Sequence, residues 1–328
     1  MVKKIIQSNE NYPKLKKIKW GVILRWGGTM ISSMLFLWLI LRQNWAIVFT
    51  KASSIALWAF PAAILFYLVS YWFNTLRWCF LLWAQGVHIS IWQAYRLNWA
   101  GYFASNFLPS TIGGDGFRML AVHPYTEKKS ISIGSVALDR IINMAAMTCL
   151  VPAPIIMFGS ALLSIFNHPV SSSVSLGTLA APITQLFKKY FPKVISAFDK
   201  WRSKPWSFFW AFLAAWPSNL IPIAATYVIA RQLGVEVNYW QVMAVQTVTY
   251  FLSVLPISVN GYGLREVAYT TLYTTLGATV EQASTLALVT RLLMVLCTIP
   301  GAIWLSSVVT KNINLDEIPE KNSQDGVI

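Results

Sequence analysis

Long apolar runs separated by short polar stretches fill most of this chain. Runs of about 20 apolar residues are typical of helices that cross the roughly 30 Å hydrocarbon core of a bilayer. The pattern predicts six full spans, over residues 26–41, 53–76, 131–150, 155–166, 206–230 and 284–309. The second run ends at Arg77, whose long side chain we expect to reach the cytoplasmic interface.

Two other apolar segments are less suited to crossing the membrane. A helix over residues 92–108 reaches only about 25 Å at roughly 1.5 Å per residue. Its polar residues Asn98, Tyr102 and Ser105 fall on one helical face, which we expect to face protein. The sequence therefore predicts a re-entrant helix here, and a second one over residues 240–255, followed by a mixed stretch over residues 264–276.

An internal repeat links these two segments. Residues 108–118 (LPSTIGGDGFR) recur as residues 255–265 (LPISVNGYGLR), with five identities and a constant offset, since 255 − 108 = 147 and 265 − 118 = 147. Each copy breaks a helix with proline and then supplies glycines. Broken helices at matching positions of two halves indicate a transporter binding site. The alternative is an ordinary interfacial loop in each half.

These patterns predict an all-α polytopic membrane protein with about six full spans and two re-entrant helical hairpins, arranged as an inverted repeat. Eight spans are the alternative. We expect a single membrane domain over residues 1–328, with halves at 20–166 and 206–310, a basic cytoplasmic connector at 167–205 and a polar tail at 311–328.

Composition and charge agree with a membrane protein. The chain is 56% hydrophobic and 12% charged, with a net charge of +14. The basic residues cluster beside apolar runs rather than on a soluble domain, so we expect no nucleic-acid partner. Lysines crowd the first 25 residues and the connector, which favours a cytoplasmic N-terminus. The expected location is the cell inner membrane, with several passes and membrane lipids as partners.

Several ionisable residues lie at or near membrane depth, where they need a partner or a function. Arg118 and Arg265 follow the glycine-rich breaks, where a guanidinium and helix N-terminal amides could grip a phosphate. Arg–carboxylate pairing inside the fold is the alternative, most of all for Asp139 and Glu266. The candidate substrate-binding residues are Arg118, Arg265, Arg140, Arg291, Asp115, Asp139, Glu266, Gly114 and Gly261. We expect positive φ or close ligand approach at the two glycines.

The sequence offers no catalytic, metal or cofactor motif. Three cysteines and three histidines are scattered without ligand spacing, so we predict no metal site. No nucleophile stands beside a base in a supporting context. The run Gly113–Gly116 is not a Walker A loop, because the Lys-Ser/Thr ending is absent. We therefore expect no cofactor and no catalytic residue.

Four pieces of sequence in a fixed order resemble a known family. They are residues 106–118, the Ala-Leu-Asp-Arg of 137–140, the stretch 259–266 ending Gly-Tyr-Gly-Leu-Arg-Glu, and Arg291 with Pro300-Gly301. Together they resemble the lysylphosphatidylglycerol synthase membrane region, over about residues 20–310. The resemblance implies movement of lipids between leaflets and a separate glycosyltransferase or lipid synthetase as partner. Synthases of that family carry a soluble aminoacyl-transfer domain after this region, so we do not expect this chain alone to aminoacylate a lipid.

Three hypotheses follow. The first is a flippase-like translocator of an anionic or zwitterionic phospholipid or a lipid-linked glycan. The second is a membrane-embedded transferase on a lipid-linked sugar or aminoacyl lipid, with Asp115 or Asp139 as base. The third is a non-catalytic partner of a glycosyltransferase. The enzyme question stays open, and a transporter is favoured because no catalytic constellation is present.

Overall fold

The computed structural model describes residues 41, 45–106, 111–126, 128–167, 204–254 and 263–305. All regular structure in these residues is helical, which confirms the predicted all-α class. The helices are α2 (Trp45–Ser53), α3 (Ala59–Ala84), α4 (Ile91–Ser105), α5 (Thr111–Val122), η1 (His123–Tyr125), α6 (Lys129–Thr148), α7 (Pro152–Asn167), α9 (Pro205–Gln232), α10 (Tyr239–Val254), α11 (Leu264–Thr275) and α12 (Val280–Thr298). The predicted first span, most of the connector and the tail lie outside the described residues.

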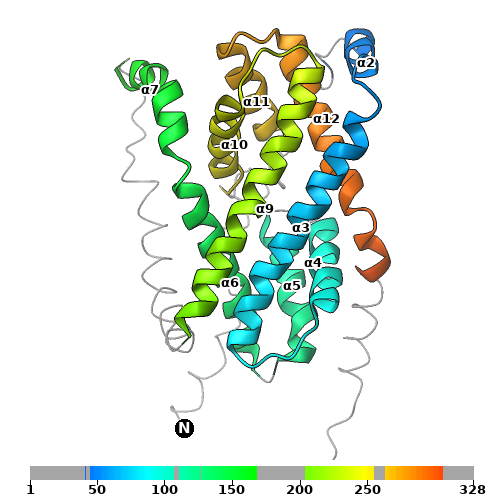
Figure 1. Cartoon of the computed structure of the whole chain (residues 1–328), viewed down its shortest axis with the longest axis vertical. Helices are drawn as coiled ribbons and strands as arrows, with labels where there is room; N and C mark the ends of the chain where they lie inside the picture. Colours follow the sequence, from blue (N-terminus) through cyan, green and yellow to red (C-terminus); the bar gives the residue numbers. More distant parts are fainter. Residues whose placement is uncertain are drawn as a thin grey trace, which may run out of the picture.

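Three helices are long and apolar enough to cross a membrane, namely α3, α9 and α12. Helices α3 and α9 pack against each other and run the length of the molecule (Figure 1). Pro222 inside α9 has no amide proton to bind the Ser218 carbonyl. The Ser70 hydroxyl of α3 donates to that carbonyl instead, at 2.8 Å. A freed polar group at the packed interface thus finds its partner on the neighbouring helix.

The runs 131–150 and 155–166, predicted as two spans, correspond to helices α6 and α7, which are bent by 45° at the break before Pro152. Neither helix alone is among the candidate spans, but taken together they are long and apolar enough to form one. Figure 1 shows α7 continuing from α6 toward the upper end of the molecule. Proline fits the first turn of a helix but interrupts a continuous one, so the bend falls at its position. The described residues hold up to four candidate spans.

Two pairs of shorter helices fill the space beside the long ones. Helices α4 and α5 pack against each other in the lower half, and α10 and α11 pack in the upper half (Figure 1). They have 15, 12, 16 and 12 residues in that order, so none of them is long enough to be a candidate span. The links between the partners, residues 107–110 and 255–262, lie outside the described residues.

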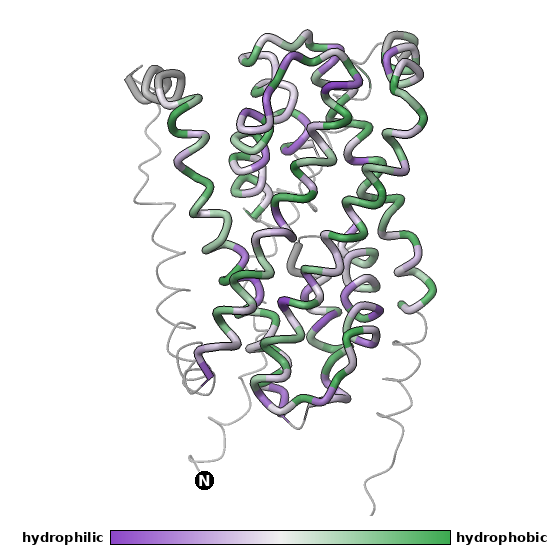
Figure 2. Tube along the Cα trace, viewed as in Figure 1, coloured by the Kyte–Doolittle hydropathy of each residue, from purple (hydrophilic) through white to green (hydrophobic). Residues whose placement is uncertain are grey.

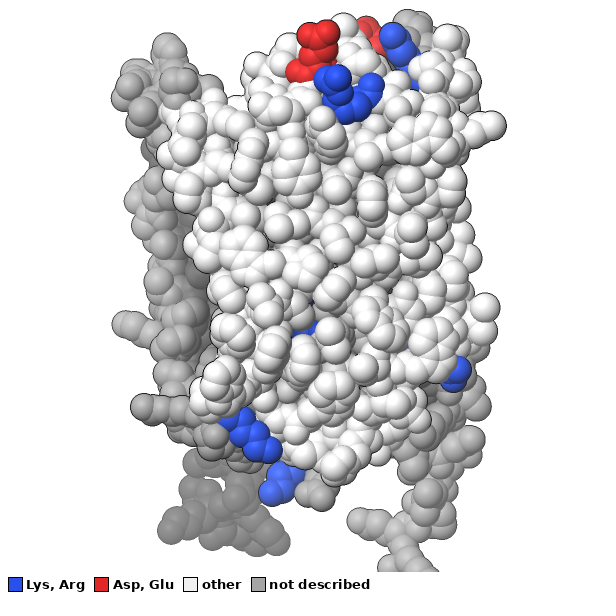
Figure 3. Space-filling model, in the orientation of Figure 1, with Lys and Arg blue, Asp and Glu red and all other residues white. Residues whose placement is uncertain are grey.

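The outside of the described body is apolar along its length. Leu57, Ile156 and Trp206 are 85%, 83% and 71% exposed, and Figure 2 shows hydrophobic residues along both the long and the short helices. In Figure 3 the charged residues gather at the two ends, while most of the middle carries none apart from a small blue patch. An apolar belt between two charged ends is what a bilayer requires. The protein is therefore a multi-pass membrane protein.

Candidate functional site

A carboxylate held by two arginines marks the middle of the lower half. Asp139 on α6 accepts from Arg77 Nε at 2.6 Å and from Arg118 Nη2 at 3.0 Å. All three residues are at most 4% exposed. Arg77 also donates to Asn143 Oδ1 at 2.6 Å. The expectation that Arg77 reaches the interface is wrong, because α3 continues seven residues beyond it, to Ala84, and buries its side chain.

A second ion pair joins α5 to α6. Asp115 accepts from Arg140 Nε at 2.7 Å and has a longer contact with Arg118, at 3.5 Å. Arg118 also lies over the Trp78 ring, with its Cζ 4.4 Å from the centroid. Asp139 forms no ion pair with its sequence neighbour Arg140, because neighbours on a helix point about 100° apart. Asp139 therefore pairs across to α3 and α5, and Arg140 pairs with Asp115.

The upper half carries one such pair. Glu266 accepts from Arg291 Nε at 2.7 Å and, through its other oxygen, from the Gly263 amide at 2.7 Å. Gly263 caps α11 with φ of 78°, a backbone conformation that glycine adopts without strain. Glu266 is 1% exposed. Glu266 thus caps the first turn of α11 through one oxygen and binds Arg291 of α12 through the other.

Arg265 differs from the other central arginines. It donates to Met294 Sδ at 3.0 Å and to the Tyr269 hydroxyl at 3.3 Å, and its Cζ lies 5.2 Å from the centre of the Tyr269 ring. Among the described residues it forms no ion pair with a carboxylate. The guanidinium is therefore held by a thioether and a phenol, neither of which carries a full negative charge.

The two halves repeat one ion pair with a shift. Asp115–Arg140 and Glu266–Arg291 each span 25 positions, and they are related by 266 − 115 = 291 − 140 = 151. The sequence motif repeats with an offset of 147, so both members of the pair move by four residues, about one helical turn. A one-turn shift keeps each side chain on the same face of its helix, which preserves the contact between the second hairpin helix and the following span.

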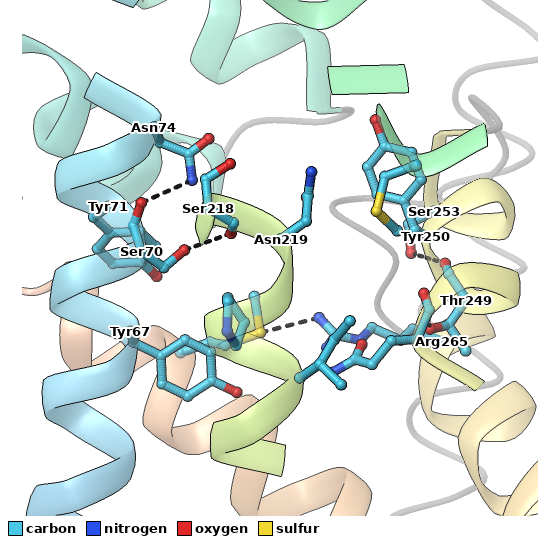
Figure 4. Close-up of a pocket in the computed structure, with 15 residues that line it drawn as sticks. Tyr67, Ser70, Tyr71, Asn74, Ser218, Asn219, Thr249, Tyr250, Ser253 and Arg265 are labelled. Carbon is cyan, nitrogen blue, oxygen red and sulfur yellow. Dashed lines mark hydrogen bonds between the residues drawn. The ribbon is translucent and has the colours of Figure 1, made fainter. Parts of the chain in front are cut away.

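Two adjoining cavities lie between these helices. The upper one, of about 230 Å³, is lined by Arg265 and by hydroxyl and amide side chains of α3, α9 and α10. Figure 4 shows Arg265 on one side of this cavity, facing Tyr67 and Asn219. The lower one, of about 270 Å³, is lined by Arg77, Arg118, Asp139, Arg140 and Arg291. Both cavities share the side chains of Tyr71, Asn74, Asn219, Tyr250, Ser253 and Met294.

Gly114 does not have the backbone conformation that we expected. Helix α5 begins at Thr111, so Gly114 lies inside a helix and is not among the glycines with positive φ. A Cβ at Gly114 would stand 2.6 Å from the Gly101 carbonyl oxygen and 2.7 Å from Ser105 Cβ. The glycine therefore allows α5 to approach α4 closely, and the expectation of positive φ there is wrong. Gly261 lies outside the described residues.

The remaining predicted residues come together, and some partners were missed. Arg118, Arg140, Arg291 and Asp139 line one cavity, with Asp115 and Glu266 paired beside it. Tyr102 and Ser105 line the same cavity, as their shared polar face indicated. Sequence reasoning missed Asn143, Tyr250, Ser218 and Asn219, of which the first donates to Tyr250 Oη at 3.0 Å. A polar stripe at Arg140 and Asn143 was the available signal.

The described residues contain no group of three or more His, Cys, Asp or Glu side chains that could hold a metal ion. The polar side chains that line the two cavities are guanidinium groups, a carboxylate, hydroxyls and amides.

Comparison with known proteins agrees with this architecture. No curated protein matches the chain in sequence. The sequence pattern of the family described as Lysylphosphatidylglycerol synthase TM region matches residues 25–301. This match takes in all the residues of the two cavities and both copies of the repeated motif, residues 108–118 and 255–265. The chain belongs to the lysylphosphatidylglycerol synthase TM region family.

Proposed function

We propose that this protein moves a lipid with an anionic or zwitterionic headgroup, or a lipid-linked glycan, between the leaflets of the inner membrane. The observation that carries the proposal is the pair of arginine-lined cavities between the two short helical hairpins. Charged groups at membrane depth are costly unless they pair or bind something. Here they line a space large enough for a polar headgroup, while the outside of the protein remains apolar.

The arrangement of the hairpins supports alternating access. One hairpin, α4–α5, occupies the lower half and the other, α10–α11, the upper half (Figure 1). We infer that they are re-entrant and form an inverted repeat, with the binding site where their tips meet. In transporters with such repeats, rocking of one half against the other exposes a fixed midplane site to each side in turn. The headgroup would pass through the cavities while its acyl chains stay in lipid.

Charge at the two ends supports a cytoplasmic lower end. Lys128, Lys129 and Lys204 are exposed there, whereas the upper end carries Glu236 and Glu281 together with basic residues such as Arg231. Lysine is enriched on the cytoplasmic side of short loops. We infer that the N-terminus, which precedes the first span, is cytoplasmic as well, and that a separate lipid synthetase or glycosyltransferase supplies the lipid.

The transferase alternative receives less support. It requires Asp115 or Asp139 as a base, yet both oxygens of each carboxylate already contact arginine. A general base must reach the proton that it abstracts. Neither group is presented to the cavity in that way, so the described residues favour binding over chemistry.

The decisive experiment is reconstitution of the full chain in liposomes with a leaflet-specific assay of fluorescent and natural lipids. Arg265→Lys keeps the charge but loses the planar fork that can hold phosphate through two hydrogen bonds. We expect the translocation rate to fall about tenfold, the equivalent of one lost charge-assisted hydrogen bond. Arg118→Lys should slow translocation too, and Arg231→Lys, at an exposed position near the upper end, should leave the rate unchanged.

Three results would contradict the proposal. No lipid translocation by the reconstituted wild-type chain would remove the transport function. Full rates for both Lys variants would mean that the arginines serve only the fold. A modified lipid product formed from a mixture of donor and acceptor lipids would instead establish a transferase.

A further inference from the structure

The charges of the two cavities do not balance. Five arginines, Arg77, Arg118, Arg140, Arg265 and Arg291, line them. Only three carboxylates contact these arginines, those of Asp115, Asp139 and Glu266. Among the described residues the site therefore carries two more positive than negative charges. Such an excess at membrane depth favours a ligand that brings negative charge.

A buried donor at the lower cavity has no acceptor. Arg118 Nε is buried without a hydrogen-bond partner in the described structure, and Arg118 is 4% exposed. The Tyr67 hydroxyl at the upper cavity also forms no close hydrogen bond, but the nearby Thr226 hydroxyl keeps one lone pair for it after donating to the Pro222 carbonyl and accepting from Gln246. Buried donors are nearly always satisfied. Arg118 Nε therefore points to a ligand that brings an acceptor to the lower cavity.

Three hydroxyls that line the upper cavity use their protons in hydrogen bonds to backbone carbonyls. Ser70 donates its proton to the Ser218 carbonyl, Thr249 to the Val245 carbonyl and Ser253 to the Thr249 carbonyl. A hydroxyl that donates to the backbone retains lone pairs that can still accept. These side chains therefore offer acceptors to a hydroxyl-bearing ligand beside the Arg265 guanidinium (Figure 4).

An ammonium group placed in either cavity would find no free carboxylate among the described lining residues. The upper cavity has no carboxylate among its lining residues, and the lower one has only Asp139, which two arginines already hold. An amine placed here would meet excess positive charge without a counterion. Like charges at close range in a medium of low dielectric repel strongly.

From these contacts, and on the basis of the proposed lipid transport, we propose that the site selects a headgroup with an anionic phosphate and a small, uncharged, hydroxyl-bearing substituent. Headgroups that bear an amine are rejected. The phosphate lies between Arg265 and the lower arginines, and its substituent contacts Ser70, Thr249 and Ser253. A cavity of about 230 Å³ has the volume of roughly eight water molecules, which suits a glycerol or a single sugar.

Binding and transport are measured separately, with the purified full chain. Native mass spectrometry compares phosphatidylglycerol, phosphatidylethanolamine, phosphatidylcholine, lysyl-phosphatidylglycerol and a hexose linked to polyprenyl phosphate, and the leaflet assay uses the same lipids. We expect phosphatidylglycerol or the polyprenyl-linked hexose to bind at least tenfold more tightly than the three amine-bearing lipids. Whichever of phosphatidylglycerol and the polyprenyl-linked hexose binds more tightly shows whether the phosphate belongs to a phospholipid or to a polyprenyl carrier.

One substitution should reverse the preference. Gln246→Glu adds a carboxylate to the lining of the upper cavity, and we expect the ratio of anionic to amine-bearing lipid bound to fall about tenfold. Gln241→Glu is the matched control, since it makes the same change on the same helix at an exposed cap. There the Gln241 side-chain oxygen accepts from the Asn238 amide, which Glu preserves, so the control should leave the ratio unchanged.

The outcomes separate this inference from the proposed function. Equal binding and equal transport of phosphatidylglycerol and phosphatidylethanolamine would overturn the selectivity and leave transport intact. Preferred binding of phosphatidylcholine would also overturn it and would indicate an aromatic site for the ammonium. Selective binding of the anionic lipids without translocation of any lipid would support the selectivity and overturn the transport function.

Discussion

Loss of the Asp139 carboxylate should destabilise the fold more than loss of the Asp115 carboxylate. Asp139→Asn keeps the shape of the side chain but removes the charge that lies 2.6 Å from Arg77 Nε and 3.0 Å from Arg118 Nη2. The amide that replaces the carboxylate also places an N–H donor against a guanidinium, which can only donate. Both arginines are 4% exposed, so solvent cannot compensate for the loss. Removal of one partner from a buried ion pair costs about 3–5 kcal/mol.

Asp115→Asn provides the comparison. Its partner Arg140 has a side chain that is 39% exposed, and its second contact, to Arg118, is 3.5 Å long. A pair with that exposure contributes about 1 kcal/mol after screening. We therefore expect Asp139→Asn to lower the free energy of unfolding by at least twice as much as Asp115→Asn.

The measurement is a denaturation curve of the detergent-purified chain in mixed micelles with rising sodium dodecyl sulfate, followed by circular dichroism. Glu236→Gln, at an exposed position of the upper end, is the control and should leave the midpoint unchanged. Arg77→Gln combined with Asp139→Asn should recover part of the loss, because contacting residues couple. Equal midpoints for the two Asp variants would refute the argument that burial of Asp139 makes its pairs essential.

Two further predictions concern helix packing and orientation. Gly114→Ala should destabilise the α4–α5 contact by about 1–3 kcal/mol, since its Cβ would stand 2.6 Å from the Gly101 carbonyl oxygen, whereas Gly116→Ala, which has open space, should be tolerated in the same denaturation assay. Equal loss at both glycines would argue for a propensity effect instead. In a cysteine-free background, a cysteine at Glu236 should react with an impermeant thiol reagent added outside, and one at Ser130 should not. Labelling at Ser130 alone would reverse the orientation.

Hydropathy located most of the described helices because apolar runs at membrane depth have few other outcomes. It does not say how two apolar runs divided by prolines are arranged relative to each other. The run 155–166 has the composition of a span, but composition does not record the direction of a chain after a proline. The 45° bend between α6 and α7 could therefore not be read from hydropathy. The sequence did predict that the helix over residues 92–108 is short, and α4 with its 15 residues confirms this prediction.

The candidate arginines could be found from the sequence, but their partners could not. Ionisable residues in apolar runs are conspicuous, so Arg118, Arg140 and Arg291 were identified at once. Pairing depends on which helices lie side by side, and not on adjacency in the chain. Asp139 pairs with Arg77 and Arg118, and Glu266 pairs with Arg291 rather than Arg265. The Asp139–Arg77 contact joins residues 62 positions apart, a separation that no local pattern encodes.

Arg265 and Glu266 are adjacent in the sequence but make different contacts. Consecutive residues on a helix point about 100° apart, so Glu266 turns toward Arg291 while Arg265 turns into the upper cavity. The Tyr269 ring stabilises a guanidinium by about 0.5–2 kcal/mol, and placing an arginine at mid-membrane costs about 2.5 kcal/mol or more. The ring contact alone therefore does not offset that cost. An arginine that a ligand can pair without displacing a carboxylate is suited to the phosphate binding that we propose.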